Sequence, residues 1–283
     1  MASIIDPATR VGLVSLSVGN LDRSLGYYQH NIGLAVLDYD RHSATLGAGA
    51  TPLLHLREVP GARVVRRATG LYHFALRVPT RLDLAQVIKH LWESETHVGG
   101  ASDHLVSEAL YLSDPDGHGI EIYRDRPRDT WYDAKGTFRM GTEPLDVGSI
   151  LGELTADAPA WSGMPDGTDM GHIHLQVADV SAADRFYVGV LGMERMAGMA
   201  SASFVSAGGY HHHIGLNSWA GVGVPAPPEN AARLLSYELL LSTAAAVEAI
   251  VERAREADVA VSEQSDGWSL RDPSHNTIVL RVA

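Results

Sequence analysis

The chain has 283 residues, of which 45% are hydrophobic and 20% charged, as in a globular protein with one large domain or two smaller ones. Its formal net charge of −12 argues against a nucleic-acid partner, which normally needs a basic surface. The sequence shows no secretory signal and no apolar run near the ~18 residues of a membrane helix, so we expect a cytoplasmic protein without membrane contact. Because it contains no cysteine, disulfides, thiolate metal sites and Cys nucleophiles are excluded, and a metal must bind to His, Asp or Glu.

Four related segments follow one another along the chain, at residues 9–60, 68–125, 169–219 and 233–283. Each reads as a strand, a helix and about three strands in which apolar and polar residues alternate. The first and third segments align with Val18 opposite Val177 and Gly33 opposite Gly192. An internal repeat of this kind predicts a fold built from copies of one unit.

In chain order, the first two segments each begin with an apolar strand followed by a capped amphipathic helix. The second segment ends in LYLSDPDGHGIEIY, and the fourth ends in the related WSLRDPSHNTIVLR. The turns of these two motifs hold His118 and His275, which we expect to be exposed to solvent. Residues 126–168 are rich in Gly, Pro and Asp and predict a linker over the surface, with a helical turn in PLDVGSILGEL.

A sheet with one apolar face must bury that face against another element, so one copy alone is not a stable unit. The predicted fold is therefore of the α+β class, with four βαβββ modules that pair into two cupped eight-stranded sheets. The first strands of paired modules would meet at the bottom of each cup. Side chains from separate modules can converge there.

The first strands of two modules carry a histidine at the same position. His73 lies five residues before Val78, and His172 lies five residues before Val177. The corresponding residue is Leu13 in the first module, and Ser236 or Tyr237 in the fourth. A lone strand histidine is more often a hydrogen-bonded core residue than a ligand, but equivalence by internal repeat favours a shared role for these two.

Glu121 supplies a carboxylate in the last strand of the second module. It lies between Ile120 and Ile122, so strand alternation directs it to the face opposite the isoleucines. Two histidines and one carboxylate on neighbouring strands hold one face of a divalent iron and leave the other face open. This set requires the second module to pair with the third. If the first paired with the second instead, His55, His73 and Glu121 would converge and His172 would be unused.

This repeat and ligand pattern resembles the vicinal oxygen chelate superfamily and, within it, the type I extradiol dioxygenases of the catechol 2,3-dioxygenase kind. The resemblance covers nearly the whole chain and implies that His73, His172 and Glu121 bind Fe(II), with Mn(II) as the alternative. The sequence departs from many members of that family in one respect. Those members carry the glutamate on the fourth module, where this chain has Val279.

The same resemblance assigns roles to further residues. Tyr111, four residues before the turn Pro115, would hydrogen-bond the substrate, and the segment GGYHHHIGLNSW would supply an acid-base histidine. Alignment of the apolar residues that follow selects His212, with His211 and His213 as alternatives. The substrate-contacting histidines would be His104, His174 and His213.

The function implied is extradiol cleavage of a catechol-like aromatic by dioxygen, which gives a ring-opened muconic semialdehyde-type product, and we also expect a homo-oligomer. Three other functions compete with it. They are ring cleavage of a hydroquinone, a glyoxalase-like isomerase or lyase with a different metal, and metal-free binding of an aromatic drug. A glyoxalase-type site tends to use two carboxylates, whereas this chain offers one convincing carboxylate.

Overall fold

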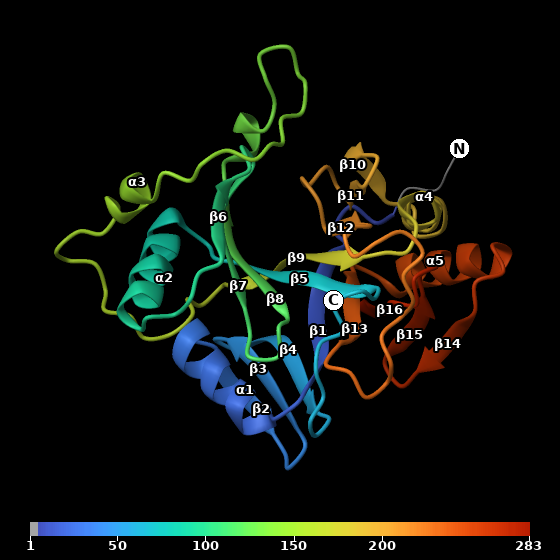
Figure 1. Cartoon of the computed structure of the whole chain (residues 1–283). Helices are drawn as coiled ribbons and strands as arrows, with labels where there is room; N and C mark the ends of the chain where they lie inside the picture. Colours follow the sequence, from blue (N-terminus) through green and yellow to red (C-terminus); the bar gives the residue numbers. More distant parts are fainter. Residues whose placement is uncertain (1–4) are drawn as a thin grey trace.

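The computed structural model describes residues 5–283, and each of the four copies folds as a strand, a helical segment and three further strands (Figure 1). The first copy consists of β1 (Arg10–Val18), α1 (Leu21–Tyr27), a π-helix (Tyr28–Ile32), β2 (Ala35–Tyr39), β3 (Ser43–Ala48) and β4 (Thr51–Glu58). The second consists of β5 (Gly70–Arg77), α2 (Arg81–Glu93), β6 (Gly100–Asp103), β7 (Ser107–Ser113) and β8 (Gly119–Asp125).

The second half of the chain repeats this order after the linker. The third copy consists of β9 (Asp169–Gln176), α4 (Val180–Asp184), a π-helix (Arg185–Val190), β10 (Glu194–Met199), β11 (Ala202–Ser206) and β12 (Ile214–Asn217). The fourth consists of β13 (Leu234–Leu241), α5 (Ala244–Glu256), β14 (Val261–Gln264), β15 (Gly267–Arg271) and β16 (Thr277–Val282). The linker holds a 3-10 helix (Arg128–Thr130) and α3 (Val147–Leu151), which coincides with the helical turn predicted there.

Polar caps start each copy's helix directly after its first strand. The side chain of Asn20 accepts a hydrogen bond from the backbone N–H of Arg23, and Asp179 caps α4 in the same way. Thr80 and Asp83 form a reciprocal capping box at the start of α2. These caps begin each helix directly after its strand.

The sixteen strands form two eight-stranded sheets, as predicted. Sheet A has the order β14-β15-β16-β13-β1-β4-β3-β2, and sheet B has the order β10-β11-β12-β9-β5-β8-β7-β6. At the centre of sheet A, β1 pairs antiparallel with β13, and at the centre of sheet B, β5 pairs antiparallel with β9. The first copy therefore pairs with the fourth, and the second with the third. The alternative pairing of the first copy with the second is wrong, because His55 lies on β4 in sheet A.

Two buried tyrosine–aspartate hydrogen bonds connect the sheets to each other. The hydroxyl of Tyr28, in the first copy, donates to Asp114 in the turn of the second copy at 2.9 Å. The hydroxyl of Tyr187, in the third copy, donates to Asp272 in the turn of the fourth copy at 3.0 Å. Sheet pairing joins copies one to four and two to three, and these bonds join one to two and three to four. The four copies thus form a closed ring of contacts.

One expectation about the turns is wrong. His118 is buried, and its Nε2 lies 2.9 Å from the backbone oxygen of Ser17, to which it donates. The turn therefore packs against the first strand of the neighbouring copy instead of facing water, whereas His275 is exposed as expected.

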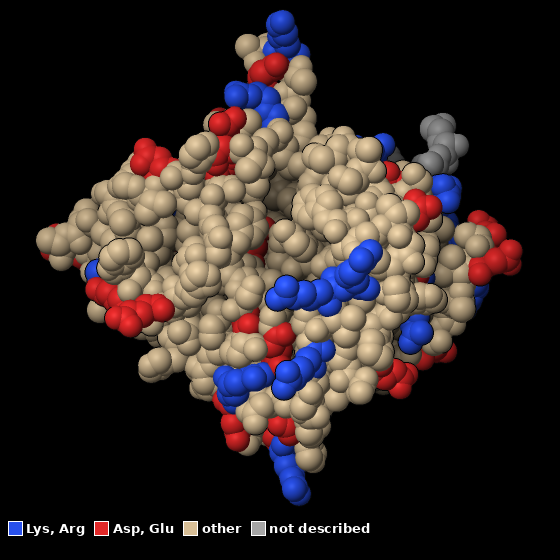
Figure 2. Space-filling model, viewed as in Figure 1, with Lys and Arg blue, Asp and Glu red and all other residues tan. Residues whose placement is uncertain are grey.

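Over residues 5–283, no helix is long and apolar enough to cross a membrane. On the face shown in Figure 2, basic and acidic side chains form separate small groups on a mostly uncharged surface.

Candidate metal centre

Three neighbouring strands of sheet B bring His73, Glu121 and His172 together. Ala75, at the middle of β5, is paired with His172 of β9 on one side and with Glu121 of β8 on the other. His73 lies two residues earlier on β5 and so points to the same face. In the described part of the chain, these three residues are the only set of three His, Asp or Glu side chains close enough to share a metal ion.

The distances between the donor atoms suit one bound ion. Oε2 of Glu121 lies 3.0 Å from Nε2 of His73 and 3.1 Å from Nε2 of His172, and all three donors lie within 4.8 Å of one another. Two donors that bind one ion at right angles, each at about 2.1 Å, lie about 3.0 Å apart. The contact from His73 lacks hydrogen-bond geometry, so its buried Nε2 has no hydrogen-bond partner among the described residues. The donor set therefore fits a divalent cation better than a closed hydrogen-bond network.

The electrostatics keep Glu121 and His172 in the forms that bind metals. Burial raises the pKa of Glu121, but the imidazoles of His172 and His73 outweigh burial and hold the pKa well below 4.5. Burial lowers the pKa of His172 to about 4, although Glu121 opposes the shift. At neutral pH the carboxylate is charged and this imidazole is neutral, which are the forms that bind metals.

A cavity of about 360 Å³ opens directly against this centre. Its walls come from both halves of sheet B and from the linker, and consist of Tyr72, His73, His104, Val106, Ser107, Tyr111, Glu121, Met140, Gly141, Thr142, His174, Met199, Phe204, His212 and Trp219. The predicted residues Tyr111, His104, His174 and His212 thus all line one cavity. The ring of His174 also keeps a buried Nε2 without a hydrogen-bond partner in the described chain.

The structure distinguishes the three consecutive histidines. Only His212 lines the cavity, and its ring packs against His172 with centroids 4.2 Å apart. His211 is fully buried behind it, with Nδ1 2.8 Å from Nδ1 of His212. His213 turns away, because its Nδ1 accepts hydrogen bonds from the Ser206 hydroxyl and the Ala207 N–H. We expected His213 to contact the substrate, but it does not line the cavity. We also expected the three histidines to lie in a strand, but they lie in the turn before β12.

The half-buried carboxylate of Asp125 lies behind His211. Oδ1 of Asp125 lies 2.8 Å from Nε2 of His211, and Arg77 and the hydroxyl of Tyr210 also donate to this carboxylate, at 2.9 and 3.1 Å. Burial raises the pKa of Asp125, but the contacts with His211 and Arg77 lower it below 3.8 overall. Asp125 therefore accepts hydrogen bonds only, and Nε2 of His211 must donate.

Tyr111 is held at the cavity wall by a second histidine. His104 donates from Nδ1 to the backbone oxygen of Gly141 at 2.7 Å, so its Nε2 accepts from the Tyr111 hydroxyl at 2.6 Å. Burial and the charge of Glu121 raise the pKa of Tyr111 far above 10, which keeps the hydroxyl protonated. Because both nitrogens of His104 are occupied, this residue acts on a ligand through Tyr111.

The linker contributes more to the site than its composition indicates. Trp131 is buried and packs edge-on against His211 with centroids 5.1 Å apart, and Met140, Gly141 and Thr142 form part of the cavity wall. Sequence analysis also missed Asp125. The signal was present, because Glu121, Tyr123 and Asp125 alternate along β8 and so share its inward face.

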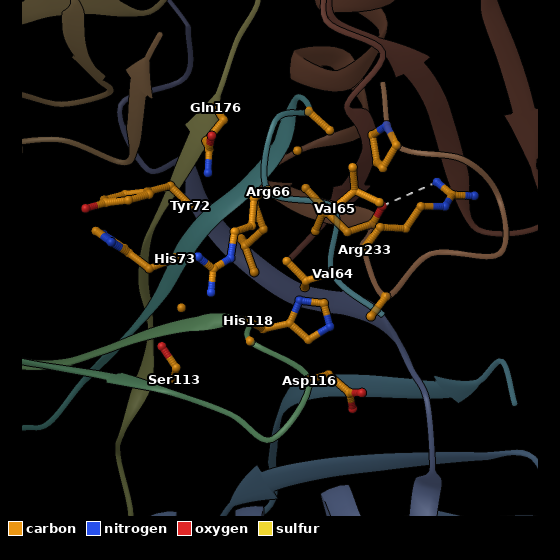
Figure 3. Close-up of a pocket in the computed structure, with 18 of the residues that line it drawn as sticks. Val64, Val65, Arg66, Tyr72, His73, Ser113, Asp116, His118, Gln176 and Arg233 are labelled. Atoms are coloured by element: carbon orange, nitrogen blue, oxygen red, sulfur yellow. Dashed lines mark hydrogen bonds between the residues drawn. The ribbon is translucent and has the colours of Figure 1, made fainter. Parts of the chain in front are cut away.

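A second, larger groove of about 800 Å³ adjoins the cavity and shares Tyr72, His73 and Tyr111 with it. Figure 3 shows this groove with Arg66 between the β5 residues and His118, and with Arg233 on its far side. It lies between the segments that join the copies and is more polar than the cavity.

Comparison with known proteins places the chain in a family. Residues 10–122 match the family model described as Glyoxalase/Bleomycin resistance protein/Dioxygenase superfamily. The chain is 43% identical over 281 residues to a protein of Bacillus subtilis (strain 168) named Catechol-2,3-dioxygenase, and the match covers 97% of each chain. The chain belongs to this superfamily. The resemblance found from the repeat is thereby confirmed.

Solved structures support the fold of this superfamily member. A putative dioxygenase from Bacillus subtilis shares 14% of its sequence over 99% of this chain and 86% of its own, with a TM-score of 0.65. Glyoxalase I from Zea mays shares 17% over 97% of this chain and 92% of its own, with a TM-score of 0.59. At these identities the likeness concerns the paired cupped sheets and not the reaction.

Proposed function

We propose that this protein is an extradiol dioxygenase, which opens the ring of a catechol-like substrate with dioxygen next to the two hydroxyl groups. The observation that carries the proposal is the set of His73, Glu121 and His172 at the end of a cavity large enough for an aromatic ring. The near-full-length similarity to a catechol-2,3-dioxygenase supports the same reaction. The single carboxylate in the donor set disfavours the glyoxalase alternative.

His73, His172 and Glu121 would hold a divalent metal, Fe(II) by preference and Mn(II) as the alternative. Two neutral imidazoles and one carboxylate are the donor set typical of non-haem Fe(II) oxygenases. When bound, such an ion supplies a Lewis acid for the substrate oxygens and electrons for reaction with dioxygen.

His212 is the proposed acid-base residue. Nε2 of His211 donates to Asp125, so a singly protonated His211 accepts at Nδ1 and His212 must donate from its own Nδ1. This leaves Nε2 of His212 unprotonated on the cavity side. Burial and the surrounding imidazoles lower the pKa of His212 well below 6.5, which keeps the ring neutral at pH 7. Nε2 can therefore accept a proton from a substrate hydroxyl and return it later to the opened product.

Tyr111 and His174 are proposed to position the ring. The Tyr111 hydroxyl is oriented by His104, and its oxygen can accept a hydrogen bond from the substrate. His174 lies beside His73 with ring centroids 5.0 Å apart and offers an unpaired Nε2 to a ligand. These contacts would hold the hydroxyl-bearing edge of the substrate against the metal side of the cavity.

Reconstitution under anaerobic conditions with Fe(II), Mn(II) or Zn(II), followed by catechol and then air, tests the proposal. We expect a yellow ring-opened product and uptake of one dioxygen per catechol with Fe(II) or Mn(II), and none with Zn(II). Turnover of hydroquinone but not catechol would move the reaction to the hydroquinone class. Turnover of a hemithioacetal without dioxygen would replace the proposal with an isomerase.

The expectations of a cytoplasmic location and of a homo-oligomer remain predictions. Cell fractionation tests the first, and light scattering of the purified protein tests the second.

A further inference from the structure

The cavity next to the metal centre is lined in part by the polar side chains already assigned to the metal and to the substrate hydroxyls. Its other lining residues are mostly apolar or aromatic, with Val106, Met140, Met199, Phe204 and Trp219 beside the hydroxyls of Ser107 and Thr142. A catechol whose oxygens face the metal therefore places its ring substituent among mostly apolar side chains.

No Lys or Arg belongs to the described lining of this cavity. Its one charged side chain is the carboxylate of Glu121, and its remaining polar groups are hydroxyls and histidines. A carboxylate on the substrate ring would thus lose water without gaining a Lys or Arg partner. Burying an unpaired charge in this way is strongly unfavourable.

The size and the mouth of the cavity agree with an uncharged substituent. A dry cavity of about 150 Å³ holds a benzene ring, and the cavity here measures about 360 Å³, so space remains beyond a single ring. Met199 and Trp219, which line it, are 60% and 51% exposed. In Figure 2 a hollow opens between the two halves of sheet B, and the atoms at its rim are mostly uncharged. Exposed apolar side chains around a cavity are typical of an apolar ligand.

We propose that the substrates are catechols whose ring substituent is uncharged and apolar, such as an alkyl group, a halogen or a second ring. This inference rests on the proposed function and concerns the specificity of the same site. Arg66 could contact a substrate carboxylate from the adjoining groove, where its side chain is exposed (Figure 3). Arg66 does not line the cavity itself.

Two measurements on the metal-loaded protein test the inference. The first is kcat/KM in air for 4-methylcatechol against 3,4-dihydroxyphenylacetate, for which we expect a preference of at least about 100-fold for the methyl compound. The second is anaerobic calorimetric binding of the same pair, which reports the preference without turnover. If neither compound is cleaved but the methyl compound binds more tightly, the inference holds while the proposed reaction fails. Equal or tighter binding of the carboxylated compound overturns the inference.

A charge introduced at the cavity rim gives the matched test. Met199→Lys places a cation on an exposed lining position, and we expect it to reduce the preference for the methyl compound by about fivefold. Met199→Gln, which is polar but uncharged, should keep the preference within about twofold of the unaltered protein. If the unaltered protein accepts the carboxylated compound and Arg66→Ala abolishes this, the adjoining groove contributes the substituent site and the inference is wrong.

Discussion

Oε2 of Glu121 lies next to both candidate histidines, so a single carboxylate oxygen supplies the negative charge at the metal centre. Glu121→Gln keeps the shape of this side chain but removes its charge. We expect metal affinity to fall by more than about 100-fold, because loss of a direct ligand exceeds the usual 10–100-fold effect of an outer partner. Elemental analysis after dialysis, together with metal titration, measures the change.

Glu108→Gln is the matched control for this substitution. Glu108 is equally buried in sheet B, but it pairs with Arg81, Arg124 and Arg126 and lies outside the donor set. We expect this variant to lose stability and to retain its metal. Full metal retention in Glu121→Gln would contradict the assignment of Glu121 as a ligand.

Asp125 acts on the cavity through His211 and is a positioning residue. Asp125→Asn can present an amide N–H to Nε2 of His211, which would reverse the donor direction and leave Nε2 of His212 protonated. We expect kcat to fall by roughly 10²–10⁴ with the metal content unchanged, as for loss of a general base. The pH profile of kcat should change shape as well, which a purely structural role would not produce.

Asp169→Asn controls for the loss of the ion pair with Arg77. Asp169 also binds Arg77, through two hydrogen bonds of 3.0 and 2.6 Å, but it contacts no histidine of the cavity. We expect its kcat within about threefold of the unaltered protein. An equal loss in both variants would show that Arg77, and not the histidine pair, governs activity.

Among the individual site residues, the histidine donors were predictable because the repeat placed His73 and His172 at equivalent positions. The residues behind His212 were not predictable, since Asp125 and His211 meet only after β8 and the turn before β12 are brought together. The three adjacent histidines look alike in the sequence. Only the turn geometry decides which ring lines the cavity.

Gly171 of β9 precedes the candidate ligand His172 and lies close against Tyr123 of β8. A Cβ on Gly171 would lie 1.9 Å from the hydroxyl oxygen of Tyr123, which bonds the Tyr210 hydroxyl at 2.6 Å. Gly171→Ala must displace Tyr123, so we expect a loss of about 1–3 kcal/mol in the free energy of unfolding. Denaturant titration of the metal-free protein measures the loss.

Gly26→Ala in α1 serves as the comparison. No atom lies within 4 Å of a Cβ at Gly26, and alanine favours the helical conformation. This variant should be neutral or more stable by up to ~1 kcal/mol. If the two substitutions had equal effects, the close approach at Gly171 would not be the cause.

The strands and helices of the four copies could be predicted from the sequence, because caps and alternation are local signals. The structure of the linker could not be predicted in this way. Its composition predicts an exposed connection, whereas Trp131 and Met140 pack at the site through contacts with residues far away in the chain. Such contacts arise from the tertiary structure and leave no periodic pattern.

Across the whole molecule, several neutral histidines are buried in sheet B. Burial lowers the pKa of His172 to about 4 and that of His213 to about 3, and it lowers those of His174 and His212 well below 6.5. In the unfolded state each ring takes up a proton near pH 6.5. The unfolded state is therefore stabilised relative to the folded state as the pH falls below that value. For His172 and His213 we expect the metal-free protein to lose roughly 1.4 kcal/mol per histidine and pH unit between pH 6.5 and about 4. His174 and His212 should add to this loss in the same direction.

Chemical denaturation at several pH values measures this slope. His213→Gln removes one titrating ring away from the cavity and should reduce the proton uptake on unfolding by about one near pH 5. A denaturation midpoint that does not change between pH 7 and 5 would rule out neutral burial of these rings.

The pairing of copies was predictable because ligands from the second and third copies had to meet, and the sheet order agrees. The register also resolves the ambiguous counterpart of His73. Glu238 pairs with Val279 as Ala75 pairs with Glu121, so Ser236, two residues earlier, is that counterpart. The links between the sheets were not predictable, since nothing local indicates that Tyr28 and Tyr187 reach across to aspartates in other copies.

Because of that closed ring of contacts, a metal bound in sheet B should also stabilise sheet A against opening. Because no copy can open without breaking either a sheet pair or a tyrosine–aspartate bond, the slowest-exchanging amides of β13 and β16 should exchange only through global opening. Metal at about 100 times its dissociation constant should then slow their hydrogen exchange by about 100-fold, although these strands lie in sheet A. Protection confined to sheet B would instead show that the two cups open independently.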